Sequence, residues 1–133
     1  MPISQEAKLL SKGQRILIID DNEDDARLFR RILENAGYLV TSTTSGKEGL
    51  RAIREGELEL VILDLAIPDI DGFEILRAVR DQAPKPKIIA ATGFIRGGMM
   101  GAARLCGADL VLDKLVAMDV LVVSVRSLLE TPS

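Results

Sequence analysis

The chain has 133 residues, a length that predicts one domain with a hydrophobic core of its own. Hydrophobic residues make up 47% of it and charged residues 28%, which excludes an intrinsically disordered chain. The net charge of −3 and the presence of only three Phe and one Tyr argue against direct binding of nucleic acid, which needs a basic face or a stacking platform. Because the chain has no histidine, catalytic triads and histidine-ligated metal sites are excluded.

The cellular location is indicated by two further features of the sequence. The single Cys106 cannot form an internal disulfide and fits a reducing compartment. The first residues lack the apolar segment of a signal peptide, and no apolar run approaches the roughly 18 residues of a membrane helix. We therefore expect a cytoplasmic protein without a membrane partner. We also expect a tail over residues 1–13, one domain over 14–130 and a tail or linker start over 131–133.

Strand and helix patterns alternate along the whole chain. Short aliphatic runs predict the strands, and apolar residues at helical spacing predict the helices. The strands are expected over residues 15–20, 38–43, 59–64, 87–91 and 108–113. The helices are expected over 23–36, 46–56, 72–83, 95–106 and 117–130. Five such alternations predict an α/β fold with a doubly wound parallel sheet and right-handed crossovers.

Several helix ends carry local signals. Asn22 and Asp71 are placed as N-caps, and Gly37 is placed as a left-handed stop. Ser45 and Glu48 have the spacing of a capping box. These signals predict where three of the helices begin and where the first one ends.

The last two helices differ from the others in composition. The helix over 95–106 contains three glycines, each of which costs about 0.8–1 kcal/mol relative to alanine, so we expect it to be weak or movable. The inward stripe of the last helix is expected to be Met118, Leu121, Val122, Val125 and Leu129. Val116, Val120 and Val123 then fall on a second face, which should be more exposed than a monomer favours.

Polar residues follow four of the predicted strands. Asp20 and Asp21 end the first strand, Asp64 ends the third, Thr92 follows the fourth and Lys114 follows the fifth. The carboxyl ends of parallel strands meet at one rim, where ligands bind in open α/β sheets. Two carboxylates about 4 Å apart repel by roughly 4 kcal/mol at an effective dielectric near 20, so the cluster needs a cation or a basic side chain. Oxygen ligands on an open site suit Mg²⁺, which indicates phosphoryl chemistry.

Each of these residues also has a purely structural interpretation. Asp64 alone could simply begin a solvated loop, lysines at strand ends are usually solvated, and threonines often bond to local backbone. Two better known motifs do not fit: Gly46 and Lys47 lack the other residues of a phosphate-binding loop, and residues 20–31 lack the Gly and Glu of an EF-hand. The joint placement on one rim is therefore what indicates a site.

Four spaced motifs together resemble the receiver domain of two-component response regulators. They are Ile19–Asp21, Asp64–Gly72, Ile89–Gly93 and Gly107–Lys114. The resemblance covers roughly residues 14–130. It implies a flavodoxin-like (βα)5 fold, a three-layer sandwich with a parallel sheet of strand order 2-1-3-4-5.

The resemblance also implies roles for the acidic residues. Asp64 would be the phospho-acceptor, taking a phosphoryl group from a histidine kinase or a phosphotransfer protein. Asp21, Asp64 and the backbone carbonyl of Ala66 would bind Mg²⁺ directly, and Asp20 would bind it through water. An in-line phosphoryl transfer needs such a nucleophile, cation and set of positioned charges.

Two further residues and an output surface follow from the same resemblance. Thr92 would move toward the phosphoryl group, and Lys114 would pair with it. Phosphorylation would then repack the helix over 95–106, the strand over 108–113 and the last helix, the family's usual output surface, which would contact a downstream effector protein or domain. The exposed valines of the last helix indicate a homodimer through the same surface. The protein would be a switch and not an enzyme, with at most the ability to catalyse its own phosphorylation and dephosphorylation.

The sequence departs from the family pattern in three places, all on this output side. Leu115 stands where the family usually has a proline joined by a cis bond, and a non-proline cis bond costs about 2.5–4 kcal/mol. We therefore expect a trans or strained bond and a displaced Lys114. Val111 stands where the family usually has an aromatic residue, so the usual coupling to Thr92 is not available. The third departure is the glycine-rich segment 97–101.

Val111 and Leu115 motivate a rival hypothesis, a receiver-fold interaction module that signals without phosphorylation. A small Mg²⁺ phosphatase is disfavoured, because Ala66 stands where a second catalytic acid would follow Asp64. A flavin-binding relative of the same fold is disfavoured by the acidic residues 20–25, where a phosphate-binding loop would lie.

Overall fold

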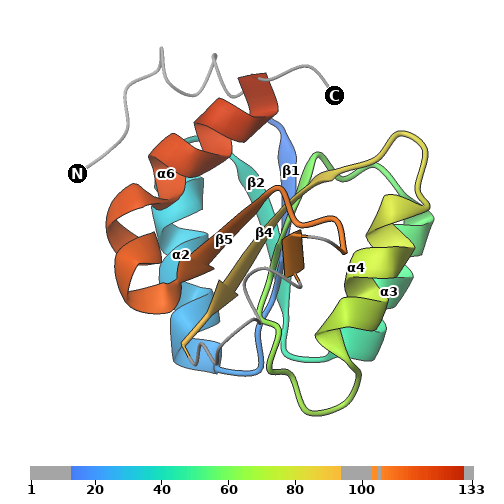
Figure 1. Cartoon of the computed structure of the whole chain (residues 1–133). Helices are drawn as coiled ribbons and strands as arrows, with labels where there is room; N and C mark the ends of the chain where they lie inside the picture. The colour runs from blue at the N-terminus through green and yellow to red at the C-terminus, as the bar shows by residue number, and fades with distance from the viewer. Residues whose placement is uncertain (1–12, 94–102, 105, 131–133) are drawn as a thin grey trace.

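The computed structural model of the chain describes residues 13–93, 103–104 and 106–130. Its strands form one parallel sheet in the order β2-β1-β3-β4-β5, which confirms the predicted order (Figure 1). The strands are β1 (Arg15–Ile19), β2 (Leu39–Thr43), β3 (Leu60–Leu63), β4 (Lys87–Thr92) and β5 (Leu110–Asp113). The helices are α2 (Glu23–Asn35), α3 (Gly46–Glu55), α4 (Gly72–Arg80) and α6 (Lys114–Glu130). Within the described part of the chain, none of these helices is long and apolar enough to cross a membrane.

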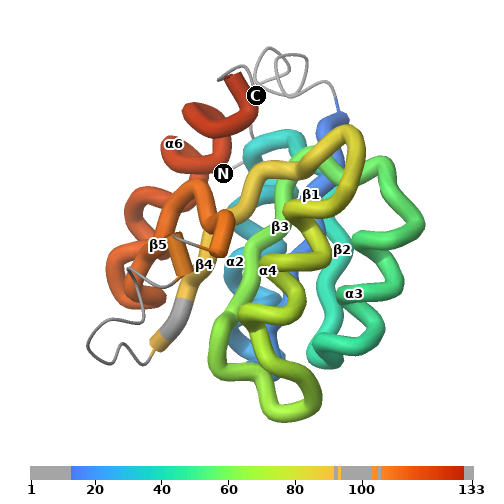
Figure 2. The backbone as a smooth tube through the Cα atoms, turned by 45° about the vertical axis from the view of Figure 1, so that its right-hand side comes forward, coloured from blue at the N-terminus to red at the C-terminus, as the bar shows by residue number. Residues whose placement is uncertain are grey.

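Helices cover both faces of the sheet, so that the fold has three layers. Helices α2 and α6 lie on one face, and α3 and α4 lie on the other (Figures 1 and 2). One core cluster joins the first pair to the sheet through residues such as Phe29, Leu33 and Leu121. The second cluster joins α3 and α4 to the opposite face through Ile53, Leu76 and others. The flavodoxin-like sandwich is therefore confirmed.

The two central strands explain why the acidic residues meet. Every residue of β3 is buried, as a four-residue aliphatic strand between two helical layers should be. Strand β1 pairs with β3 in parallel register, with Ile19 opposite Leu63. The next residue of each strand is an aspartate, Asp20 or Asp64. The register therefore delivers these two side chains to neighbouring positions at the rim.

Two of the predicted N-caps are confirmed, and the capping box is only half formed. The side chain of Asn22 accepts a hydrogen bond from the Asp25 N–H, and that of Asp71 accepts one from the Phe73 N–H. Ser45 caps α3 by accepting from the Glu48 N–H. The Ser45 N–H, however, donates to the Thr43 hydroxyl at 3.1 Å, and Glu48 accepts from that hydroxyl instead. Thr43 takes the place in this cap that the capping-box pattern gives to Glu48.

The last helix begins earlier than the sequence pattern predicts. Helix α6 starts at Lys114, directly after β5, and not at residue 117. A proline after Lys114 would disfavour helical geometry at that lysine, and Leu115 removes this restriction. The Asp113 carboxylate accepts a hydrogen bond from the Leu115 N–H at 2.8 Å and caps the new first turn. The bond between Lys114 and Leu115 is not cis, in agreement with the trans alternative.

The predicted faces of α6 are partly right. Leu121 and Val125 are buried as expected, together with Ala117. Met118 was predicted to face the core but is exposed, because it lies at the flank of the buried stripe of the helix. Val116 and Val123 are exposed as expected, whereas Val120 is half-buried. Most of the predicted helix over 95–106 lies outside the described residues.

Candidate functional site

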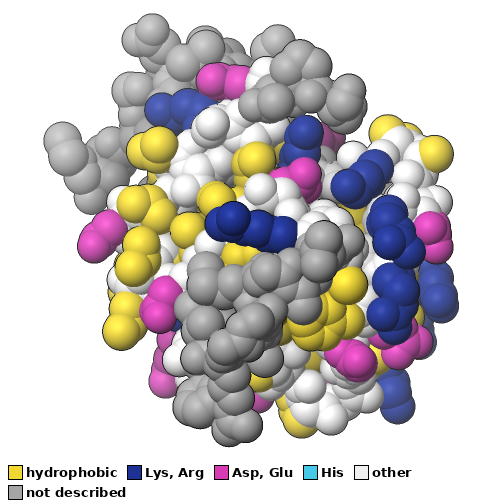
Figure 3. All heavy atoms as spheres, viewed as in Figure 1, with side chains coloured by type: hydrophobic (Ala, Val, Ile, Leu, Met, Phe, Trp, Pro, Cys, Tyr) yellow, Lys and Arg dark blue, Asp and Glu magenta, His cyan; other side chains and the backbone are white. Residues whose placement is uncertain are grey.

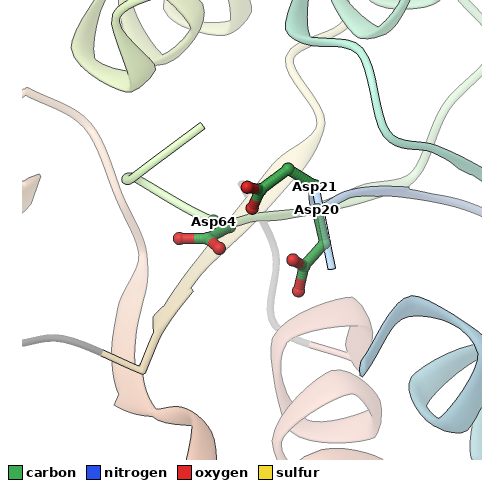
Figure 4. A group of neighbouring side chains, drawn as sticks. All are labelled: Asp20, Asp21 and Asp64. Atoms are coloured by element: carbon green, nitrogen blue, oxygen red, sulfur yellow. The ribbon is translucent and has the colours of Figure 1, made fainter. Parts of the chain in front are cut away.

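Three carboxylates converge at the carboxyl ends of β1 and β3. One oxygen from each of Asp20, Asp21 and Asp64 can be chosen so that all three lie within 4.8 Å of one another. Figure 4 shows the three side chains close together, with Asp20 and Asp21 from the end of β1 and Asp64 from the end of β3. Asp20 and Asp64 are buried, and Asp21 is exposed. The cluster is thus open to solvent on the side of Asp21.

Backbone hydrogen bonds fix the two buried carboxylates. Asp20 accepts a bond of 3.0 Å from the Asn22 N–H, and Asp64 accepts one of 2.9 Å from the Ala66 N–H. Burial raises the pKa of the Asp20 carboxyl above its ordinary value of 3.8, and this outweighs the lowering by its bonds to Lys114 and to the Asn22 N–H. The site therefore holds its carboxylates in place at an electrostatic cost.

The ammonium group of Lys114 lies among these carboxylates. Its Nζ is 2.9 and 3.1 Å from the two oxygens of Asp20 and 3.0 Å from Oδ2 of Asp64. Burial lowers the pKa of Lys114, but its hydrogen bonds to Asp20, Asp25 and Asp64 raise it more, so that its pKa lies above the ordinary 10.5. Lys114 therefore stays charged and partly neutralises the cluster, although no proline follows it.

Asp25 is part of this network, and sequence reasoning missed it. Its Oδ2 lies 3.0 Å from Nζ of Lys114. Asp25 lies in the first turn of α2 together with Glu23 and Asp24, where the positive end of the helix favours an acid whatever its contacts are. Its position five residues after Asp20, one helical turn beyond the rim, is the signal that could have indicated it.

The loop after Asp64 is tied to the neighbouring helix by Asp69. The Asp69 carboxylate accepts hydrogen bonds of 2.9 and 3.1 Å from the N–H groups of Gly46 and Lys47, and one of 3.0 Å from the Ser45 hydroxyl. The bonds from Gly46 and Lys47 hold the pKa of Asp69 below its ordinary value of 3.8. This residue was also not predicted to have a role. It fixes the loop that carries the Ala66 carbonyl.

The donor set fits a small hard cation. Three carboxylates on an open site offer the oxygen ligands that Mg²⁺ prefers, and the exposed side leaves room for water and a phosphate group. The residues that would hold the ion are Asp20, Asp21 and Asp64, and the bound ion would neutralise charge on a transferring phosphoryl group.

Thr92 lies at the same rim of the sheet as the acidic cluster. Thr92 is the last residue of β4 and pairs with Asp113 of β5, one residue before Lys114. Its side chain lies outside what the structure describes. Val111 is buried in the cluster beneath α3 and α4. The structure thus brings together Asp20, Asp21, Asp64 and Lys114.

The family of the chain is shown by comparison with known proteins. The family model "Response regulator receiver domain" matches residues 16–126. The chain belongs to this family. Membership supports a phospho-accepting signalling role, as a switch rather than an enzyme, and interaction with kinases and downstream effectors in general.

Individual relatives of this receiver domain agree with that assignment. The polar-differentiation response regulator DivK of Brucella ovis is 29% identical over 116 residues, which cover 86% of this chain and 94% of DivK. A CheY-like receiver domain protein from Methanospirillum hungatei has 30% identity and a TM-score of 0.81, covering 88% of this chain and 94% of that one. The response regulator TrrA of Thermotoga maritima, solved with Mg²⁺ and BeF, has 30% identity and a TM-score of 0.76 over 86% of this chain and 98% of TrrA.

Proposed function

We propose that this receiver domain is a phosphorelay switch in which Asp64 accepts a phosphoryl group from a histidine kinase or a phosphotransfer protein. Mg²⁺ would be held by Asp21, Asp64 and the Ala66 carbonyl directly, and by Asp20 through water. The observation that carries the proposal is the convergence of three carboxylates on one point at the end of the central strands. TrrA, a relative with the same fold, was solved with Mg²⁺ and the phosphoryl analogue BeF.

The chain's own residues supply the other parts of an in-line transfer. One oxygen of Asp64 would attack phosphorus while the bond from phosphorus to the donor nitrogen breaks and its electron pair stays with the donor. The Ala66 N–H orients the Asp64 carboxylate. Lys114 already lies 3.0 Å from Asp64, so that its ammonium is placed to pair with an added phosphoryl oxygen as a point charge. Thr92 is proposed to donate a hydrogen bond to the same group.

Labelling with a small-molecule phosphodonor tests this proposal. Incubation with acetyl phosphate and Mg²⁺ is expected to give one phosphate adduct in the intact mass, and chelation of the metal should abolish it. Asp64→Asn should remove the adduct. Asp81→Asn, which changes an exposed acid at the far end of α4, should keep it. If Asp64→Asn is labelled as well as the unchanged protein, Asp64 is not the acceptor.

We also propose that the outward face of α6, on the output side, pairs with a second copy of the chain. Hydrophobic side chains gather over this helix on the left of Figure 3, and Leu115 and Val123 are 83% and 70% exposed. In an antiparallel pair of α6 helices centred between residues 122 and 123, Asp119 of one copy would lie opposite Arg126 of the other. Sedimentation with and without beryllofluoride and Mg²⁺ measures this pairing. A sedimenting mass of one chain under both conditions would contradict it.

A further inference from the structure

Asp25 holds the functional lysine from outside the metal-binding set. Of the carboxylates that contact Lys114, Asp20 and Asp64 belong to the acidic cluster, whereas Asp25 lies in the first turn of α2. Its backbone is fixed there because the Asp25 N–H donates to the cap Asn22 at 3.0 Å. Because the side chain is 32% exposed, water could solvate its charge without an ion-pair partner. Its contact with Lys114 therefore results from where the first turn of α2 places Asp25.

The contacts of Lys114 conflict with those that a metal ion needs. The ammonium lies against both oxygens of Asp20 and against Oδ2 of Asp64. A metal ion on this cluster would approach the same carboxylates, and two cations close together repel each other. The ammonium must therefore give up part of its present contacts when the ion binds. Asp25 is the one carboxylate of its three partners that it can keep without competing with the ion.

We propose that Asp25 is a positioning residue that retains the Lys114 ammonium beside the site while a divalent cation occupies Asp20, Asp21 and Asp64. This inference rests on the proposed function, because it concerns the same site. Asp25 would lower the cost of displacing Lys114 and would keep it within reach of a phosphoryl group. The family usually has a cis proline bond after this lysine. Here α6 begins at Lys114 and the bond that follows it is not cis, so that the Asp25 side chain takes over the positioning of the ammonium group.

Calorimetric titration with Mg²⁺ alone measures this role without any phosphoryl transfer. Asp25→Asn keeps the shape of the side chain and removes the charge that retains the ammonium. We expect it to weaken Mg²⁺ binding by about tenfold, which corresponds to about 1.4 kcal/mol. Asp24→Asn is the matched control, because it removes the same charge from the adjacent residue, whose side chain is 90% exposed and does not contact Lys114. The control should change the affinity by less than about twofold, as expected for a screened surface charge.

A double-mutant cycle separates positioning from a general charge effect. Lys114→Met removes the competing cation and should tighten Mg²⁺ binding. In that background, Asp25→Asn should change the affinity by less than about threefold, because the residue that it positions is gone. Asp25→Glu, which restores the charge, should recover part of the lost affinity in the chain with Lys114. A folding defect would appear as an altered circular dichroism spectrum, and Asp25→Glu then provides the comparison.

The outcomes distinguish this inference from the proposed function. If the unchanged protein binds Mg²⁺ but Asp25→Asn binds it equally well, the inference is wrong and the proposed function stands. The inference is also wrong if the tenfold loss persists in the Lys114→Met background, because the effect is then only that of a nearby charge. If the unchanged protein neither binds Mg²⁺ nor is labelled on Asp64, both are wrong.

Discussion

Replacing Lys114 by methionine should destabilise the metal-free protein, because Lys114 is the counter-charge of a buried acidic cluster. The lysine side chain is only 13% exposed, and it contacts both Asp20 and Asp64, which are buried. Lys114→Met keeps a side chain of similar length that fits the same space. It leaves two buried carboxylates without the ammonium that now lies 3 Å or less from an oxygen of each.

The expected loss follows from the geometry of the network. Removing one partner of a buried ion pair typically costs about 3–5 kcal/mol. The cluster is open to solvent beside Asp21 and Asp25, which reduces the cost, so we expect a fall of about 2–3 kcal/mol in the free energy of unfolding. With a urea m-value of about 1.5 kcal/mol per molar, the midpoint of unfolding would fall by about 1.3–2 M.

Urea unfolding followed by circular dichroism in the presence of a chelator measures this loss. Lys85→Met removes the charge of an exposed lysine and should stay within about 0.5 kcal/mol of the unchanged protein. Adding Mg²⁺ should stabilise the Lys114→Met variant more than the unchanged protein, because the ion then neutralises the free carboxylates. If Lys114→Met unfolds at the same urea concentration as the Lys85→Met control without Mg²⁺, Lys114 does not serve as the counter-charge.

Three further predictions concern packing, pH and the surface. Gly46→Ala would place a Cβ 2.0 Å from Cγ2 of Ile70, so it should lower the free energy of unfolding by about 1–3 kcal/mol, and adding Ile70→Ala should recover part of this loss. Because the pKa of Asp69 is lowered, the stabilisation that its carboxylate provides should be present above pH 3.8 and be lost as the pH falls through the lower pKa of the folded state. The loss of thermal stability that Asp69→Asn causes should therefore shrink in acid. Titration of the Asp69 carboxyl carbon by NMR at or above pH 3.8 would contradict this. Val123→Lys should leave the stability of the monomer within about 0.5 kcal/mol but reduce self-association in sedimentation, and unchanged self-association would place the contact elsewhere.

The arrangement of the sheet could be predicted because each central strand is short, aliphatic and followed by an acid. Strands made of residues such as Ile19 and Leu63 need both of their faces covered, and a parallel sheet between two helical layers provides that environment. The same pattern puts Asp20 and Asp64 at one rim without any knowledge of their contacts. Local signals were also sufficient for the cap of Asn22, which depends on its neighbours along the chain.

Contacts between distant parts of the chain could not be predicted in this way. Asp25 meets Lys114 across 89 residues, and Asp69 meets Gly46 across 23. A helix position does not show where a side chain ends in space, so sequence reasoning assigned neither aspartate a partner. The start of α6 was missed for a different reason. The absence of a proline at Leu115 permits a longer helix, but only the cap formed by Asp113 shows that the helix extends back to Lys114.

The direct junction between β5 and α6 has a consequence for how a local event can spread. Lys114 is both the ion-pair partner of the carboxylates and the first residue of a 17-residue helix. A helix of that length extends about 25 Å at 1.5 Å per residue. No connecting loop is available to absorb a shift of the Lys114 backbone. We therefore expect such a shift to be passed on along α6 rather than absorbed between β5 and the helix.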